Sequence, residues 1–178
     1  MDLTEVRQRI DTVDNQMKEL FNNRMECSKE VARVKLETGD DVFKPLREKE
    51  ILEKFSTDSQ YKSFIKKVMQ ISRKYQYGLF ASAGNIDEDY LNQMSMADRV
   101  VFKKGGIMNF KLKEDKHSER GLNLKDILAV ISDTNLDIVN LNADESEIII
   151  NLRVPDTESS KKEAMVLGYM LYMETKNN

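Results

Sequence analysis

The chain has 178 residues, of which 40% are hydrophobic and 33% charged, and its net charge is −3 with a pI of about 5.4. This composition suits one domain or two small ones, without a disordered tract or an apolar run of the roughly 20 residues that span a membrane. Because the net charge is negative, we expect no nucleic acid as a partner, and because no apolar run is long enough, we expect no membrane.

Cysteine and histidine occur once each, at Cys27 and His117, so the sequence offers neither an intrachain disulfide nor an ordinary zinc site. It contains no G-x-G-x-x-G motif and no P-loop, and Gly105-Gly106 predicts a turn. The acidic start at residues 1–5 lacks the features of a signal peptide. We therefore expect a cytoplasmic protein that needs no metal and no organic cofactor.

The first predicted element is one long amphipathic helix over residues 3–35 that continues to about Glu37. Asp2 and Glu5 have the spacing of a capping box, and Gly39 suits the turn that ends the helix. Its apolar residues recur in steps of three and four, the heptad seam of a helix packed against other helices. They are Leu3, Val6, Ile10, Val13, Met17, Leu20, Cys27, Val31 and Val34. At roughly 50 Å the helix is too long for two short helices to cover, so the seam predicts a second copy of the chain.

One slot of this seam holds a cation, Arg24, where an apolar residue is expected. A desolvated cation needs an anionic partner. Lys35 lies almost three turns further along, within about 20° on the same face, so the two cations can bracket a small anion. Arg7 lies about 25 Å before Arg24 and near 100° around the helix, so it reaches the same site only from an antiparallel partner chain. Alternatively, Arg7 and Lys35 are ordinary surface cations.

Two shorter helices follow. Pro45 begins the second helix, which residues 56–59 interrupt, and the third helix continues to about Phe80. On the third helix a basic cluster is interpreted as a solvated face. It comprises Lys66, Lys67, Arg73 and Lys74.

The pattern changes after residues 81–85, which are interpreted as a linker, and one more helix is expected over 86–96. Alternating apolar residues then predict strands at 100–103, 108–112, 136–141 and 148–154, with helices at 124–131 and 158–175. We therefore expect an all-α domain of three helices over residues 1–83, a linker or helix over 84–97, and a small ββαββα α+β domain over 98–178.

Further polar residues stand on the two shorter helices. Arg47-Glu48 closely follow Pro45, and Ser72 and Gln76 share a face because they are four residues apart. Each alone is an ordinary surface group. With the cations of the long helix they provide a carboxylate, a hydroxyl and an amide, but no activated nucleophile. This set suits the binding of a small dianion and the stabilisation of charge, without covalent or metal chemistry.

Residues 3–80 resemble the all-helical class of chorismate mutases. The resemblance is carried by LTEVRQRIDTVD at 3–14, NRM at 23–25, VARVK at 31–35, REKE at 47–50 and ISRKYQ at 71–76. It implies an intertwined homodimer that converts chorismate to prephenate by an intramolecular Claisen rearrangement in phenylalanine and tyrosine biosynthesis.

The resemblance also implies a role for each site residue. Arg24 and the partner chain's Arg7 would hold the substrate carboxylates, helped by Arg47 and Ser72.

Glu48 would accept the ring hydroxyl, and Lys35 and Gln76 would donate to the ether oxygen. The chain departs from the family at Lys44, where an acidic residue is frequent. The change would lower substrate affinity if that side chain acts near the hydroxyl, and would have no effect if only its backbone does.

Residues 121–128, GLNLKDIL, resemble the start of an ACT-type regulatory domain, with strand 100–103 replacing the last strand of that fold. The resemblance implies feedback by phenylalanine or tyrosine. The alternative is that Gly-Leu simply begins a helix after a polar loop.

Two other functions fit the sequence. An isochorismate pyruvate lyase would have a similar cationic pocket. A catalytically inactive dimeric module would position a ligand sensor, but such a dimer would gain stability from leucine in place of Arg24.

Overall fold

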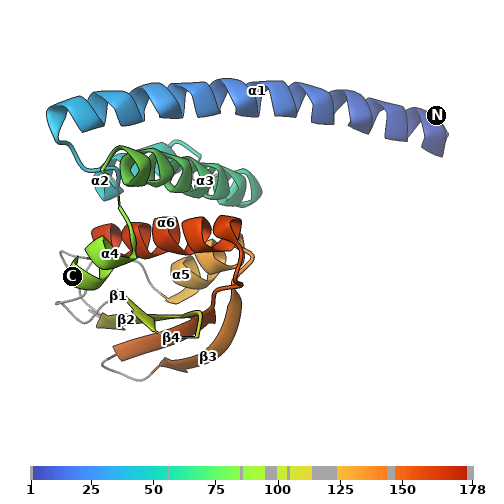
Figure 1. The fold of residues 1–178 in the computed structure, drawn as a ribbon. Coiled ribbons are helices and arrows are strands. Elements are labelled where there is room, and N and C mark those ends of the chain that lie inside the picture. The colour runs from blue at the N-terminus through green and yellow to red at the C-terminus, as the bar shows by residue number, and fades with distance from the viewer. Residues whose placement is uncertain are drawn as a thin grey trace.

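The computed structural model describes residues 2–55, 57–84, 86–94, 100–103, 105–113, 124–143 and 147–175. These residues form layers, with α1 uppermost, α2 and α3 below it, then α6 and α5, and a four-stranded sheet at the bottom (Figure 1). The elements are α1 (Leu3–Thr38), α2 (Pro45–Glu53), α3 (Ser59–Ala83), α4 (Glu88–Met94), β1 (Val100–Lys103), β2 (Ile107–Lys113), α5 (Leu124–Ile131), β3 (Asp137–Ala143), β4 (Glu147–Arg153) and α6 (Glu158–Thr175).

The long first helix is confirmed, together with the signals that begin and end it. The capping box is complete, since the Glu5 backbone N–H donates to Asp2 Oδ1 and the Asp2 N–H donates to Glu5 Oε2, both at 2.9 Å. Gly39 ends the helix in the left-handed region, with φ 70°. The 36 residues of α1 correspond to roughly 54 Å.

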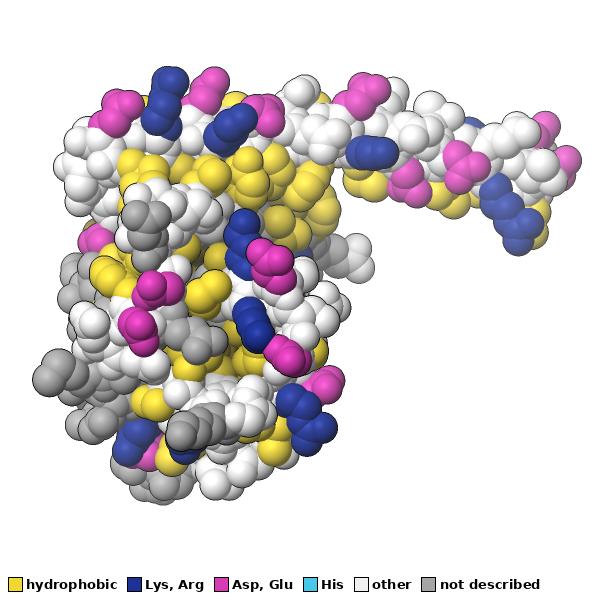
Figure 2. All heavy atoms as spheres, in the orientation of Figure 1, with side chains coloured by type: hydrophobic (Ala, Val, Ile, Leu, Met, Phe, Trp, Pro, Cys, Tyr) yellow, Lys and Arg dark blue, Asp and Glu magenta, His cyan; other side chains and the backbone are white. Residues whose placement is uncertain are grey.

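Only the C-terminal half of α1 packs against α3. Ser28 and Ala32 are its buried residues, whereas Cys27, expected in the seam, is exposed. The N-terminal half projects beyond the other elements, and its apolar side chains line one side of the projection (Figures 1 and 2). Leu3 and Leu20, for example, are 63% and 68% exposed. The later seam residues Val31 and Val34 are 44% and 52% exposed as well, so within the described chain the predicted heptad seam is uncovered in both halves of α1.

The strands lie within two residues of their predicted bounds, and two helix boundaries differ from the sequence prediction. Helix α3 continues to Ala83, so the first three residues of the expected linker are helical, and Ala81 is buried. Packing on the C-terminal region extends the helix, since Ala81 joins the same hydrophobic cluster as the sheet. Helix α4 occupies residues 88–94 of the expected 86–96, and residues 95 and 96 lie outside the described residues.

The sheet has the strand order β1-β2-β4-β3, and every neighbouring pair is antiparallel. The predicted pairing of strand 100–103 with β2 is confirmed, with Phe110 opposite both Val100 and Ile150. These three side chains are fully buried or nearly so, and they face the helices. Because α6 lies between α3 and the sheet, it is buried on most of its circumference rather than along one stripe.

The interpretation of the basic cluster on α3 as a solvated face is wrong for Arg73 and Lys74, while the side chains of Lys66 and Lys67 keep 57% and 40% exposure although they form ion pairs. Lys66 Nζ lies 2.6 Å from Asp126, Lys67 pairs with Asp133, and Lys74 Nζ lies 2.9 Å from Glu163. Arg73 is 9% exposed and pairs with Glu174 of α6. The cluster is the surface through which α3 contacts α5, α6 and the turn after α5. Sequence cannot show this, because the acids lie 60 to 101 residues away.

His117 and the predicted ACT-type residues 121–123 lie outside the described residues. Among the helices that the structure describes, none combines the length and the apolar character that crossing a bilayer requires.

Candidate active site

Arg24 and Ser72 connect α1 to α3. The Arg24 guanidinium donates through Nη1 to Ser72 Oγ, and this hydroxyl donates to the backbone carbonyl of Val68 at 2.9 Å. Ser72 is buried, because it lies at the contact between the two helices. Because the Ser72 hydroxyl hydrogen is donated within α3, its oxygen is left to accept from Arg24 and so orients the guanidinium.

Arg24 and Lys35 lie on the same side of α1, as their spacing predicted. Burial lowers the pKa of both cations below the usual values, while the charge of Glu48 raises both. Nearby Cys27 also raises the pKa of Arg24. The carboxylate of Glu48, on the first turn of α2, is therefore close enough to act on each of these half-buried cations.

Lys35 is held in place by the loop that follows its own helix. Its Nζ donates to the Val42 carbonyl at 2.8 Å. Val42 is buried, so the loop anchors the ammonium group at the end of α1 from which the chain turns to α2.

Glu48 is bound by Arg73, a residue that belongs to the basic cluster predicted to face solvent. Arg73 Nη1 contacts both carboxylate oxygens of Glu48, and its Nε donates to Glu174 Oε1 at 2.9 Å. The guanidinium also lies over the ring of Phe43, 4.9 Å from the centroid. The only local signal for Arg73 is its place beside Ser72, about 100° around the helix, which turns it toward the next layer.

Gln76 lies one turn beyond Ser72 on the same face of α3 and is 7% exposed. Its Oε1 is one of two buried side-chain oxygens without a hydrogen-bond partner in the described part of the chain. A buried amide oxygen without a partner costs about 1–3 kcal/mol, a cost that native structures tolerate mainly where a group has a further role.

Two predicted site residues lie apart from this group. Arg47 pairs with Glu50 at 3.0 Å on the surface of α2, with 61% of its side chain exposed. Arg7 is exposed on the projecting half of α1. Lys44, the departure from the family pattern, pairs with Asp40 across the turn.

The structure thus brings Arg24, Lys35, Glu48 and Ser72 together between three helices, with Gln76 one turn away. Two partly desolvated cations and fixed donors can bind a small anion and stabilise developing negative charge. No group of three or more metal-ligating side chains occurs within the described ranges. These features define a candidate anion-binding site between helices, which would act by positioning its ligand and by stabilising charge.

Residues 6–77 match the family model of chorismate mutase type II. The matched range begins in α1, ends within α3, and contains all seven predicted site residues. The match indicates an isomerase, a chorismate mutase, with chorismate as its substrate, as the sequence resemblance implied. No curated protein and no solved structure was found to match the chain.

Proposed function

We propose that this protein is a homodimeric chorismate mutase of phenylalanine and tyrosine biosynthesis. The observation that carries the proposal is the convergence of Arg24, Lys35 and Glu48 within the range that matches the family. Arg24 binds a substrate carboxylate, with Ser72 orienting it. Glu48 accepts the ring hydroxyl.

The rearrangement is intramolecular and transfers no proton, so the protein needs only to hold a compact substrate conformer and stabilise charge. Negative charge grows on the ether oxygen as the C–O bond breaks. Lys35 and the amide of Gln76 donate to that oxygen. A preorganised donor of this kind is typically worth about 3–4 kcal/mol of transition-state stabilisation.

The exposed seam supports a second copy of the chain as the partner of α1. Val6, Ile10, Val13 and Met17 follow one another along the projecting half, with exposed fractions between 36% and 52%. An antiparallel copy would cover these side chains and bring its Arg7 to the carboxylate end of the site. Arg47 lies on the exposed surface of α2 and would turn from Glu50 toward the substrate.

The C-terminal region is proposed as an ACT-like regulatory domain. The strand order supports this assignment, because α5 connects β2 to β3 across the intervening β4, and β1 fills the edge beside β2. This connectivity is that of a ferredoxin-like sheet in which the last strand is replaced by one that comes first in the C-terminal region.

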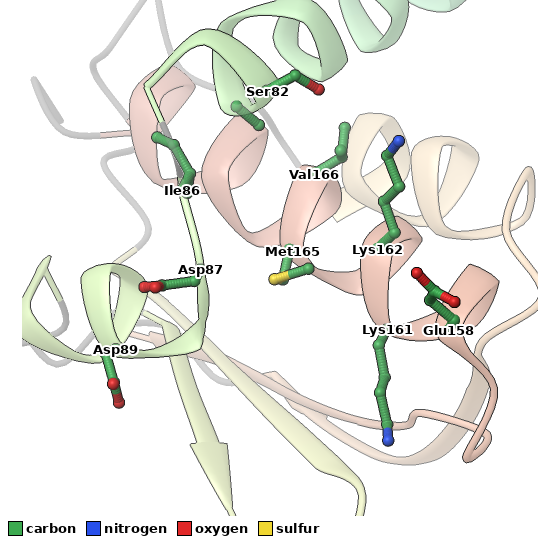
Figure 3. A pocket seen from close by; sticks show the side chains of 10 residues that line it. Ser82, Ile86, Asp87, Asp89, Glu158, Lys161, Lys162, Met165 and Val166 are labelled. Atoms are coloured by element: carbon green, nitrogen blue, oxygen red, sulfur yellow. The ribbon is translucent and has the colours of Figure 1, made fainter.

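A cavity of about 540 Å³ beside α3, α4 and α6 suits an aromatic amino acid as effector (Figure 3). Its apolar lining includes Ile86, Met165 and Val166, and charged side chains of both signs, Asp87 and Lys162 among them, also line it. A zwitterion with an apolar side chain fits this arrangement. Lys162→Ala should weaken binding of phenylalanine or tyrosine in calorimetry. No heat with either amino acid, and rates that neither changes, would refute the effector.

The central test is an assay of the purified protein with chorismate. We expect prephenate without release of pyruvate, and loss of turnover in Arg24→Ala with the dimer intact. Pyruvate released from isochorismate would show a lyase instead. A complete lack of turnover would favour a dimeric ligand-sensing module.

Subunit mixing tests the shared site. Arg7→Ala and Arg24→Ala chains should each be inactive alone, and their heterodimer should regain one working site, because one site then contains both native arginines. Failure of the mixture to regain activity would refute the contribution of Arg7 across the dimer.

A further inference from the structure

A buried arginine joins the candidate active site to the last helix of the chain. Arg73 of α3 lies between two carboxylates, Glu48 on α2 and Glu174 on α6. Residues 48 and 73 lie inside the range that matches the chorismate mutase family, and residue 174 lies far outside it. The connection therefore gives the C-terminal region direct contact with a group beside the site.

The three side chains are largely removed from solvent. The exposed fraction of the side chain alone is 11% for Arg73, 21% for Glu48 and 0% for Glu174. Although burial lowers it, the pKa of Arg73 is raised above its usual value because two carboxylates surround the guanidinium. Buried charge–charge hydrogen bonds of this kind hold their partners in one geometry, because a misplaced partner leaves an uncompensated charge.

The guanidinium can serve both acids because its donors point in fixed, different directions. Nε is used by Glu174, Nη1 is used by Glu48, and the ring of Phe43 covers one face. The orientation of Arg73, and with it the position of the Glu48 carboxylate, therefore depends on Glu174.

The position of Glu48 matters because two further cations attract it. Its charge acts on both Arg24 and Lys35, the groups proposed to bind the substrate. If Arg73 no longer bound it, the Glu48 carboxylate would be free to move toward these cations, where it would compete with the substrate anion. Arg73 thus fixes the carboxylate of Glu48, the group proposed to accept the substrate hydroxyl.

We propose that Glu174 is a positioning residue for the mutase reaction, which acts through Arg73 to hold the Glu48 carboxylate away from the substrate-binding cations. The C-terminal helix then completes the framework of the active site. This inference rests on the proposed function.

The experiment compares two leucine variants on the same helix. Glu174→Leu removes the carboxylate that accepts from Arg73 Nε. Glu163→Leu removes an ion pair between the same two helices, in which Lys74 Nζ lies 2.9 Å from Glu163. Neither Lys74 nor Asn135, the partners of Glu163, belongs to the connection with Glu48. We expect Glu174→Leu to lower kcat/KM about tenfold, mainly through KM, and Glu163→Leu to change it less than twofold. Glu174→Gln should restore most of the loss, because its amide oxygen accepts from Nε. Thermal melting would verify that each variant is folded at the assay temperature.

A double-mutant cycle separates positioning from general support of the fold. In a Glu48→Gln background, Glu174→Leu should have less than a twofold effect, whereas a merely structural role would lower kcat/KM equally in both backgrounds. Equal losses, or equal effects of the two leucine variants, would overturn the inference. An inactive wild-type protein would instead refute the proposed function.

A measurement that does not depend on enzyme activity distinguishes failure of the positioning role from failure of the proposed function. The ¹³C resonance of the Glu48 side-chain carboxylate at pH 7 should move in Glu174→Leu and stay in place in Glu163→Leu. An unmoved resonance in Glu174→Leu would overturn the positioning role even if the protein does not act on chorismate.

Discussion

The buried carboxyl of Glu174 predicts an unusual dependence of stability on pH. Burial raises the pKa of Glu174 from 4.5 to about 7, and the charge of Glu48 acts in the same direction while Arg73 opposes it. An acid with a higher pKa in the folded chain holds its proton there after the unfolded chain has lost it. The free energy of unfolding therefore falls as pH rises from about 4.5 to 7, by about 3 kcal/mol for the full shift.

Glu174→Gln removes this titration and retains the shape of the side chain. Urea unfolding of both proteins at several values between pH 5 and 8 should show the wild type losing about 2–3 kcal/mol relative to the variant across that range. The second oxygen of Glu174, which has no partner in the described part of the chain, is the natural place for the proton.

Glu163→Gln is the matched control, because its effect has the opposite sign. Although partial burial raises the pKa of Glu163, the backbone N–H of Asn135 and the ammonium of Lys74 lower it below its usual value. Its contribution to stability is complete above the unfolded pKa and is lost only as pH falls below it. The difference between wild type and Glu163→Gln should therefore stay constant from pH 5 to 8. A constant difference for Glu174→Gln as well would refute the reasoning about burial.

Three further predictions concern stability and assembly. Gly106→Ala should destabilise the fold by more than about 1 kcal/mol in thermal melting, because φ is 72° and the new Cβ would lie 2.8 Å from a backbone carbonyl; Gly105→Ala, with φ 89° and open space, should cost less. Arg73→Leu should cost about 3–5 kcal/mol in urea unfolding by leaving buried carboxylates uncompensated, and adding Glu174→Leu should recover part of this loss. Ile10→Asp should lower the apparent mass in sedimentation from that of the proposed dimer to that of a monomer; a variant that stays dimeric would contradict the role of the seam.

The arrangement of the layers explains why α3 carries so many cations. One side of α3 meets α1, where Ser72 and Gln76 lie, and the opposite side meets α5 and α6. Each cation of the cluster pairs with an acid of the C-terminal region. Partly exposed pairs such as Lys66–Asp126 contribute little stability individually, so the buried pair of Arg73 dominates the electrostatics of this contact.

The sequence alone determined the features that depend on neighbouring residues. The bounds of α1 follow from the capping box at Asp2 and the left-handed turn at Gly39, both local devices. The shared side of Arg24 and Lys35 follows from helical periodicity. The alternation in β2 and β4 fixed which side chains face the core. These predictions were confirmed because the physics behind them acts over a few residues.

Tertiary structure alone decided which side chains meet across long stretches of chain. Arg73 looks like any basic residue on a helix, and its acceptor lies 101 residues later on α6. A long-range contact also explains why the first residues of the expected linker are helical, since Ala81 is buried in a cluster with residues of the C-terminal region. Burial and charge pairing arise only when the layers pack together, so the connection from Glu174 through Arg73 to Glu48 is visible only in the folded chain.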